Sequence, residues 1–286
     1  KWPENAIPEG TFASLEALRR APRLDGQIVF IDRAMPRTQD GSGYGAVVES
    51  RSAGPSEAAR KGAAAVLIRS VGTDHHRLPH TGMLRYAEDA PSIPAAALSV
   101  PDAEQLTRML NNRTTVEVAL ELRPRFVGAR PTGNVVAEIR GTERPEEIVL
   151  VGAHLDSWDL GTGAVDDGAG IAIVMSAARL VKEQGAPERT IRVVLFGAEE
   201  VGLVGAKAYA RAHADELDRH VIAAESDFGA GPIYRLSAGG VNASGWAFVG
   251  ALQERLASLS VILGDNEAFG GPDLIPLRRA GVPVLS

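Results

Sequence analysis

The stretch EIVLVGAHLDSWDLGTGAVDDGAGIAIVMSAARLVKEQG, residues 147–185, decides the architecture that the sequence predicts. Its first part, residues 147–155, is a nearly continuous apolar run, which is typical of a strand buried on both faces of a sheet. Residues 168–185 are apolar almost all round at their start, so they predict a helix that packs against that sheet. A buried strand followed by such a helix indicates an α/β fold.

The segments on either side continue this alternation of strands and helices. We expect strands over 132–141, 190–200 and 220–229, and helices over 202–217 and 243–259. Connections as long as a helix join parallel strands. Residues 126–286 therefore predict a doubly wound, mostly parallel sheet with helices on both faces.

Residues 22–125 have a different pattern, and residues 1–21 form a short segment that leads into them. That first segment contains one short amphipathic helix, FASLEALRRA. Beyond it the sequence predicts strands over 26–33, 63–71, 93–100 and 114–123, with helices near 56–61 and 101–110. These short strands predict a small, mostly β domain with a few helices.

The composition excludes several classes of protein. The chain has 286 residues, 45% of them hydrophobic, and a net charge of −6, and its Lys and Arg residues form no cluster that would bind a nucleic acid. No apolar run approaches the roughly 18 residues of a membrane span. Cysteine is absent, so thiolate ligands are excluded. The chain opens without a signal peptide and closes within an apolar run, so we expect a piece of a longer chain.

Acidic residues and one histidine gather where the predicted strands of residues 126–286 end. Each falls at the carboxyl end of a strand or in the loop after it: His154, Asp156, Asp166, Asp167, Glu199, Glu200 and Asp227. In an open parallel sheet, ligands bind at this edge. The sequence therefore predicts that one imidazole and up to six carboxylates share one crevice.

Carboxylates that lie this close together repel one another, and burial raises the cost. A bound cation resolves the conflict, and a mixture of imidazole nitrogen and carboxylate oxygen suits zinc, with manganese or cobalt as substitutes. One ion rarely needs so many anionic ligands, whereas two ions about 3.5–4 Å apart that share a bridging carboxylate do. We therefore expect a two-metal centre.

The pair Glu199-Glu200 indicates what such a centre does. Neighbouring residues on a strand face opposite ways, so one carboxylate can bind a metal while the other stays free as a general base. Asp156 faces the same side of the strand as His154 and is expected to accept the second imidazole N–H, which fixes the tautomer. A base beside a metal-activated water predicts hydrolysis of an amide.

Two other histidines of residues 126–286 are not expected to join this centre. His220 starts the strand that ends near Asp227, roughly 23 Å away at a rise of about 3.3 Å per residue. His213 lies among Ala and Arg in a predicted helix, which favours the surface. A dinucleotide loop over GTGAVDDGAG is also disfavoured, because Asp166 stands where a third glycine is required.

The segments GAHLDSWDLGTGAVDDGAG, GAEEVGLVGA and ESDFG resemble the family-28 zinc exopeptidases, whose pattern is H-x-D, DD-G, EE and a later Asp. The spacings are similar too: 12 residues from His154 to Asp166, 33 from Asp166 to Glu199, and 27 from Glu200 to Asp227. The Ser-Trp-Asp sequence after His-Leu-Asp, and LPHTGMLRY over residues 78–86, are similar to the plasma glutamate carboxypeptidase branch. Residues 22–125 resemble the protease-associated domain of that branch.

The resemblance implies a role for each acidic residue of the pattern. By it, two zinc ions are bound by His154, Asp166, Glu200 and Asp227, with Asp166 as the bridge, while Glu199 is the general base and Asp156 orients His154. The family has one more histidine ligand, which the resemblance places beyond Ser286. Asp273, in the segment that leads to it, receives no role beyond contacts with a loop or substrate.

The function implied by the resemblance is that of a dizinc exopeptidase that cleaves dipeptides or short peptides, as an aminopeptidase, dipeptidase or carboxypeptidase. Such an enzyme is expected to be secreted or periplasmic, and its protease-associated domain to cap the cleft or support a homodimer. Two alternatives stay open. One is an inactive receptor-like or binding homologue, although the ligands and the base are present here. The other is a dizinc amidohydrolase such as a deacylase, which the strand-end ligands alone do not distinguish.

Overall fold

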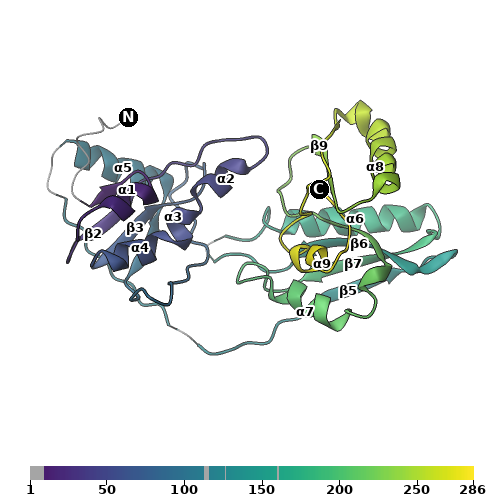
Figure 1. Ribbon diagram of the computed structural model, residues 1–286, viewed down its shortest axis with the longest axis horizontal. Helices are drawn as coiled ribbons and strands as arrows, with labels where there is room; N and C mark the ends of the chain where they lie inside the picture. The colour runs from purple at the N-terminus through teal and green to yellow at the C-terminus, as the bar shows by residue number, and fades with distance from the viewer. Residues whose placement is uncertain (1–9, 113–115, 126, 160) are drawn as a thin grey trace. The chain divides into compact units, whose positions relative to one another are not determined.

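The structure is a computed structural model that describes residues 10–112, 116–125, 127–159 and 161–286 (Figure 1). The chain divides into two compact units, Lys1–Val127 and Gly128–Ser286. Each unit has its own sheet and its own apolar core. Among the described residues, no helix combines the length and the apolar character that a membrane crossing requires.

The first unit is built on a parallel sheet in the order β1 (Thr11–Phe12), β2 (Ile28–Ile31), β3 (Ala65–Arg69) and β4 (Ala95–Leu98). Its helices are α1 (Leu15–Arg20), α2 (Ser42–Val47), α3 (Glu49–Ser52), α4 (Gly54–Arg60) and α5 (Val100–Asn111). The predicted strands over 26–33, 63–71 and 93–100 are confirmed. The helices expected in FASLEALRRA, near 56–61 and near 101–110 are confirmed as α1, α4 and α5.

This unit is more helical than the sequence predicts, because its helices hold more residues than its strands. Alternate side chains of the strands point to opposite faces, and both faces are covered. Val29 and Val66 pack with Leu18 of α1 on one face, while Phe30 packs with Leu106 of α5 on the other. The unit is therefore of the α/β type and not mostly β.

The predicted strand over 114–123 is wrong where the structure describes it. Residues 113–115 lie outside the described residues, and 116–123 form no strand. Val118 and Leu122 are exposed, and Leu120 alone of the apolar residues in 116–123 packs against the core next to α5. The alternating pattern therefore buries no complete face, which a half-buried strand requires.

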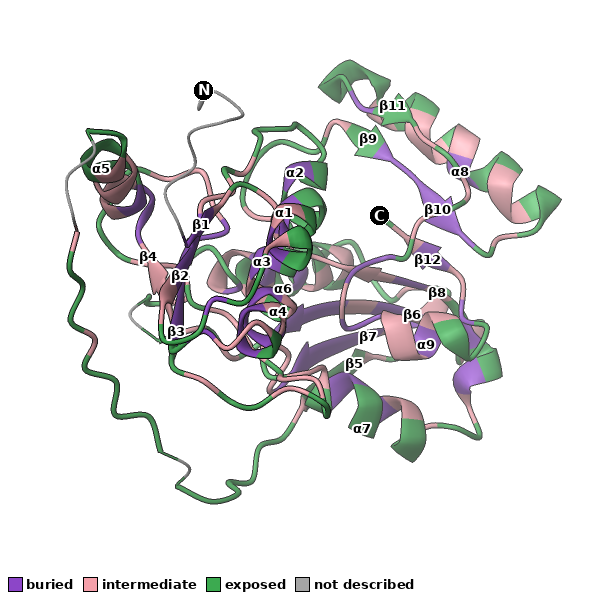
Figure 2. Cartoon of the chain, turned by 60° about the vertical axis from the view of Figure 1, so that its left-hand side comes forward, coloured by how far each residue is buried: buried purple, intermediate pink, exposed green. Residues whose placement is uncertain are grey.

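The second unit is built on a sheet in the order β10-β12-β8-β6-β7-β5. Its inner strands run parallel: β12 (Val284–Leu285), β8 (His220–Glu225), β6 (Arg144–His154) and β7 (Arg189–Phe196). The edge strands β10 (Ala238–Gly239) and β5 (Val135–Ile139) are antiparallel to their neighbours. Figure 2 shows β6 and β7 as largely buried strands, as their apolar runs predict. The mostly parallel sheet is confirmed.

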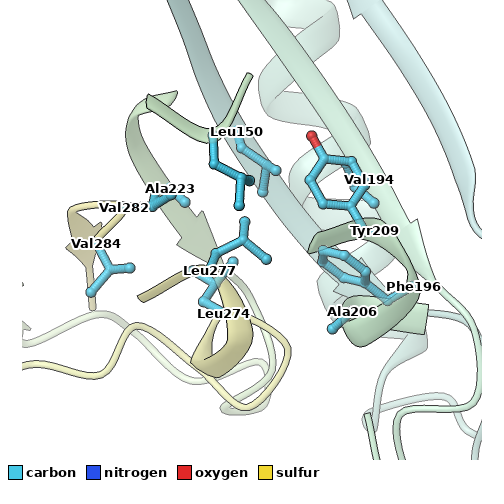
Figure 3. Packing of buried hydrophobic residues seen from close by; sticks show 11 residues of the cluster. Leu150, Val194, Phe196, Ala206, Tyr209, Ala223, Leu274, Leu277, Val282 and Val284 are labelled. Carbon is cyan, nitrogen blue, oxygen red and sulfur yellow. The ribbon is translucent and has the colours of Figure 1, made fainter. Parts of the chain in front are cut away.

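Helices cover both faces of this sheet (Figure 1). Helix α6 (Gly168–Glu183) packs Val174 against Val193 on one face. Helices α7 (Val204–Ala212) and α9 (Ile275–Arg279) lie on the other face, where Tyr209 and Leu277 join Val194 in the cluster of Figure 3. Since Val193 and Val194 are neighbours on β7, they point to opposite faces. The doubly wound arrangement is confirmed.

A helix packed on a two-stranded sheet completes the second unit. Helix α8 (Ala243–Leu256) confirms the helix expected over 243–259, and it packs over the parallel pair β9 (Arg235–Leu236) and β11 (Ile262–Leu263). The helix expected over 202–217 is shorter than predicted: α7 stops at Ala212, and a turn and the 3-10 helix η1 (Leu217–Arg219) lead into β8.

Candidate metal centre

The parallel strands of the second unit bring their carboxyl ends to one edge. His154, the last residue of β6, is paired with Phe196, the last residue of β7, and Glu225 at the end of β8 is paired with Gly152. The loops that follow these strands therefore start side by side. This is the edge at which parallel sheets bind ligands.

His154 lies at the middle of the predicted cluster. Its side chain is 1% exposed, and its Nε2 lies 3.0 Å from Oδ1 of Asp166 and 3.2 Å from Oδ1 of Asp227. The three residues offer ligand atoms that all lie within 4.8 Å of one another. The structure thus brings together residues that are 73 positions apart in the sequence.

Glu199 and Glu200 approach the same histidine. Each offers a carboxylate oxygen, and with a ring nitrogen of His154 these atoms also lie within 4.8 Å of one another. The two residues are not on a strand, since β7 ends at Phe196 and they belong to the turn after it. Glu199 and Glu200 therefore do not face opposite ways as neighbours on a strand do, contrary to the prediction. The turn directs both carboxylates toward His154.

The carboxylate of Asp156 does not accept from the imidazole of His154, contrary to the prediction. The backbone carbonyl of Asp156, not its carboxylate, accepts from Nδ1 of His154 at 2.9 Å, while the nearer carboxylate oxygen is 3.8 Å away. The carboxylate instead accepts the backbone N–H of Glu199 at 2.8 Å and that of Glu200 at 3.2 Å. Asp156 therefore fixes both the tautomer of His154 and the turn that carries the glutamates.

Asp167, to which the sequence analysis gave no role, supports the centre by accepting backbone hydrogen bonds. Its carboxylate accepts the backbone N–H of His154 at 2.9 Å and that of Gly170 at 3.2 Å, so it caps helix α6 and ties it to the end of β6. Burial raises the pKa of Asp167 to about 6. An Asp directly before a predicted helix is a capping signal in the sequence, and it could have identified this role.

Glu225 and Asp273 form a second buried acidic pair, which the sequence analysis missed. The backbone N–H of Asp273 donates to Oε2 of Glu225 at 3.0 Å. Both oxygens of Asp273 and Oε1 of Glu225 have no hydrogen-bond partner among the described residues. Burial, followed by the charge of Asp273, raises the pKa of Glu225 to about 9, and burial followed by Glu199 raises that of Asp273 to about 8. Asp273 is remote in sequence, so no spacing pattern could link it to the strand ends.

The electrostatics of the centre show an excess of negative charge. Burial opposes a charge on His154, but the hydrogen bonds to Asp166 and Asp227 outweigh it and raise the pKa of the imidazole to about 12. Burial raises the pKa of Glu199 to about 7, and burial with the charges of Asp166 and Glu199 raises that of Glu200 to about 7. Positive charge is therefore strongly favoured at this point.

The donor set fits a divalent cation. Two overlapping groups of possible ligands share His154: one adds Asp166 and Asp227, the other adds Glu199 and Glu200. Imidazole nitrogen with carboxylate oxygen is the mixture that zinc, manganese and cobalt accept. Asp166 is 61% exposed above the buried histidine, so the cluster is open to solvent on that side.

The histidines set aside in the sequence analysis lie elsewhere. His220 begins β8, at the opposite end of the strand from the centre, and its ring contacts Tyr209 and Glu216. His213 follows α7 and lies 2.6 Å from Glu216. Its side chain is 30% exposed, so it is less solvated than expected. Neither belongs to a candidate metal group.

Several known proteins are similar to this chain. The pattern of the family described as Peptidase family M28 matches residues 134–286. Carboxypeptidase Q of Bos taurus is 40% identical over 230 residues, which cover 78% of this chain and 48% of that protein. A crystal structure of a peptidase M28 precursor from Shewanella amazonensis matches with a TM-score of 0.86 at 48% identity, over 96% of this chain and 63% of that one.

A more distant match shows the fold alone. A zinc aminopeptidase from Bacillus subtilis has a TM-score of 0.60 at 21% identity, over 96% of this chain and 62% of that one. The chain spans about half the length of the curated relatives that it matches.

Proposed function

The chain belongs to peptidase family M28, and from this premise we propose that the protein is a metalloexopeptidase that hydrolyses dipeptides or short peptides with two zinc ions. The carboxypeptidase Q relatives and the clustered strand-end ligands support this proposal. A protease-associated role for the first unit, a homodimer and a secreted or periplasmic location are part of the same proposal.

Four side chains are proposed to hold the ions: His154, Asp166, Glu200 and Asp227. Asp166 suits the bridging position, because it is the more exposed of the two carboxylates that converge on His154 Nε2. Zinc bound there would polarise the substrate carbonyl and lower the pKa of water to about 7. His154 is held ready by its Nδ1 contact with the carbonyl of Asp156, which leaves Nε2 for the ion.

Glu199 is proposed as the general base, which takes a proton from water and returns it to the leaving amine. The observation that carries the proposal is the fixed turn around it. One carboxylate, that of Asp156, accepts the N–H groups of both Glu199 and Glu200, so two adjacent glutamates are presented to one imidazole. A carboxylate held in place beside the ligands, with burial that favours proton uptake, has the properties a base needs.

Exposed apolar side chains at this edge support a peptide substrate. Phe228 directly follows Asp227 and forms an edge-to-face pair with Phe269, with ring centroids 6.0 Å apart. The two residues are 65% and 49% exposed. Exposed aromatic surface beside a polar centre is typical of a binding site for an apolar group. We propose that it contacts an apolar side chain of the substrate.

The proposal is tested with Glu199→Gln and a matched control, Glu183→Gln on the exposed side of α6. Removal of the base is expected to lower dipeptide hydrolysis by about two to four orders of magnitude, with the zinc content unchanged. The control is expected to retain full activity. Unchanged turnover in Glu199→Gln would remove the proposed base. Zinc binding with hydrolysis of N-acyl amino acids but of no peptide would identify a deacylase, and neither zinc nor hydrolysis would identify an inactive homologue.

A further inference from the structure

A second group of buried polar side chains lies at the amino edge of the same sheet, where α7 ends and β8 begins. His220 is 2% exposed, and its ring is flanked by Tyr209 of α7 and by Glu216 in the turn before η1. Arg192, in the middle of β7, contacts both Tyr209 and Glu216. None of these residues takes part in the proposed chemistry.

With a neutral His220, the hydrogen bonds of this group run in one direction that satisfies each donor and acceptor. Nδ1 of His220 lies 3.0 Å from the carbonyl oxygen of Glu216, which can only accept, so Nδ1 carries a proton. Arg192 can only donate, and its Nη1 donates to the Tyr209 hydroxyl at 2.8 Å. The hydroxyl proton of Tyr209 is then directed to Nε2 of His220 at 2.8 Å. This chain requires a neutral His220.

A proton on Nε2 of His220 breaks the chain. The imidazolium would point an N–H at a hydroxyl that already accepts from Arg192, and the Tyr209 proton would lose its acceptor in a buried place. Unmade hydrogen bonds at buried groups are costly. The second positive charge would also lie near the guanidinium of Arg192. Burial, with a further contribution from Arg192, accordingly lowers the pKa of His220.

The charged and titratable groups around His220 come from several elements. They are Arg192 on β7, Glu138 on β5 through its 2.6 Å contact with Arg192, Tyr209 and Arg211 on α7, and His213, Glu216 and Asp218 in the segment before β8. The residue paired with His220 on β6 is Ile148, and the segment between α9 and β12 contributes Ala280, Gly281 and Pro283, which do not titrate. Glu216 binds Arg192 and His213 at 2.6 Å each, and its carbonyl and its charge favour a proton on His220, but burial outweighs both and the pKa of His220 is lowered.

A cavity of about 880 Å³ borders this group and is lined by His220 together with apolar residues such as Leu217 and Val221. His220 therefore borders a space that is large enough to hold water. A protonated imidazole would gain hydration by moving into that space. The cavity thus leaves room for a second position of the ring.

We propose that His220, Tyr209 and Arg192 form an acid-sensitive latch between α7 and β8, which is closed when His220 is neutral and opens when it is protonated. The latch acts on the strand whose other end leads to Asp227. In the unfolded chain the imidazole takes up a proton near its ordinary pKa of about 6.5, whereas the closed latch resists protonation. The stability that the latch provides is therefore complete above about pH 6.5 and is lost as the pH falls below it.

The experiment compares thermal unfolding of the wild-type protein, His220→Gln and His75→Gln between pH 7.5 and pH 5. The amide oxygen of Gln can accept from Tyr209 but does not titrate. We expect the wild-type midpoint to fall by about 2–4 °C more than that of His220→Gln over this range. His75→Gln should keep the full acid dependence, because His75 is an exposed residue of the first unit and is not part of the latch. Parallel curves for the wild type and His220→Gln would contradict the proposal.

A measurement on the unchanged protein covers the case in which His220→Gln does not fold. Nitrogen-15 chemical shifts of the His220 ring at pH 7 should report a proton on Nδ1 and none on Nε2. The ring should titrate below the ordinary value of about 6.5. A proton on Nε2 at pH 7, or a titration midpoint at or above that value, would overturn the latch.

Discussion

Strand β8 joins two clusters of charged residues that are built in opposite ways. At its amino end, Arg192 pairs with both Glu216 and Glu138 at distances of 2.6 Å. At its carboxyl end, carboxylates converge on the single imidazole of His154, and Asp273 keeps two buried oxygens without a partner among the described residues. The first cluster is complete within the protein, whereas the second is not.

The difference between the two ends indicates where ligand binding has shaped the sequence. Buried polar groups in folded proteins are nearly all hydrogen-bonded, and a group that is not requires a specific reason. The amino end follows this rule and contributes to stability. The carboxyl end departs from it at the edge where parallel sheets bind ligands. The excess of carboxylates around His154 fits the cation site proposed above.

The largest expected effect on stability comes from removing Arg192 from the cluster at the amino end of β8. Arg192→Met removes the donor shared by Tyr209, Glu216 and Glu138. Leaving these groups without a donor should lower the free energy of unfolding by about 2–3 kcal/mol, less than for a fully buried pair because Glu138 is partly exposed. Urea denaturation measures this loss. Zinc affinity of the folded protein should stay the same, and a parallel loss of zinc would show that the two ends are not independent.

At the carboxyl end of the sheet, Asp156→Asn is expected to have a smaller effect, on zinc affinity and on activity. The Asn side chain has one oxygen in place of two, so it can accept the N–H of Glu199 or of Glu200 but holds the turn less firmly. Loss of such supporting contacts typically costs about 10–100-fold in metal affinity or activity. Zinc titration with a competing chelator and dipeptide turnover would show this. Asp159→Asn, in the same loop, serves as the control and should leave both values near wild type.

The smallest effect is expected from Asp273→Asn in the metal-free protein. The folded state holds the proton of Asp273 up to a pKa of about 8, whereas the unfolded chain releases it near the ordinary value, so this group makes the protein less stable as the pH rises between the two. The Asn variant should therefore gain about 2–4 °C in its unfolding midpoint at pH 8 relative to wild type. At pH 4 the two midpoints should be closer. A difference that does not change with pH would contradict the assignment.

Much of the fold follows from the sequence because the second unit is patterned by burial. The runs over 147–155 and 190–200 became β6 and β7, and the apolar start of 168–185 became α6. The first unit was harder to predict. Its strands have two to five residues, and TTVEVALELR alternates like a strand although its described residues have no partner strand. Periodicity alone cannot supply a partner, so this prediction failed.

The site residues that stand at the ends of strands could be predicted. The contacts that depend on backbone groups could not. The convergence of His154, Asp166 and Asp227 follows from parallel strand order. The contact of His154 with the carbonyl of Asp156 could not be read from residue types, because every residue has a carbonyl. The burial of Asp273 beside Glu225 depends on a segment 48 residues away, and no local pattern marks it.

If the carboxyl edge of the sheet is a metal centre, the protein binds zinc. Counting the bound zinc tests this most directly. Elemental analysis after dialysis is expected to find bound zinc in the wild-type protein and the same amount in His213→Gln. It should find a clear loss in Asp227→Asn, which removes a carboxylate oxygen 3.2 Å from Nε2 of His154. A wild-type protein that retains no zinc, or an Asp227→Asn variant that retains as much as the wild type, would contradict the account.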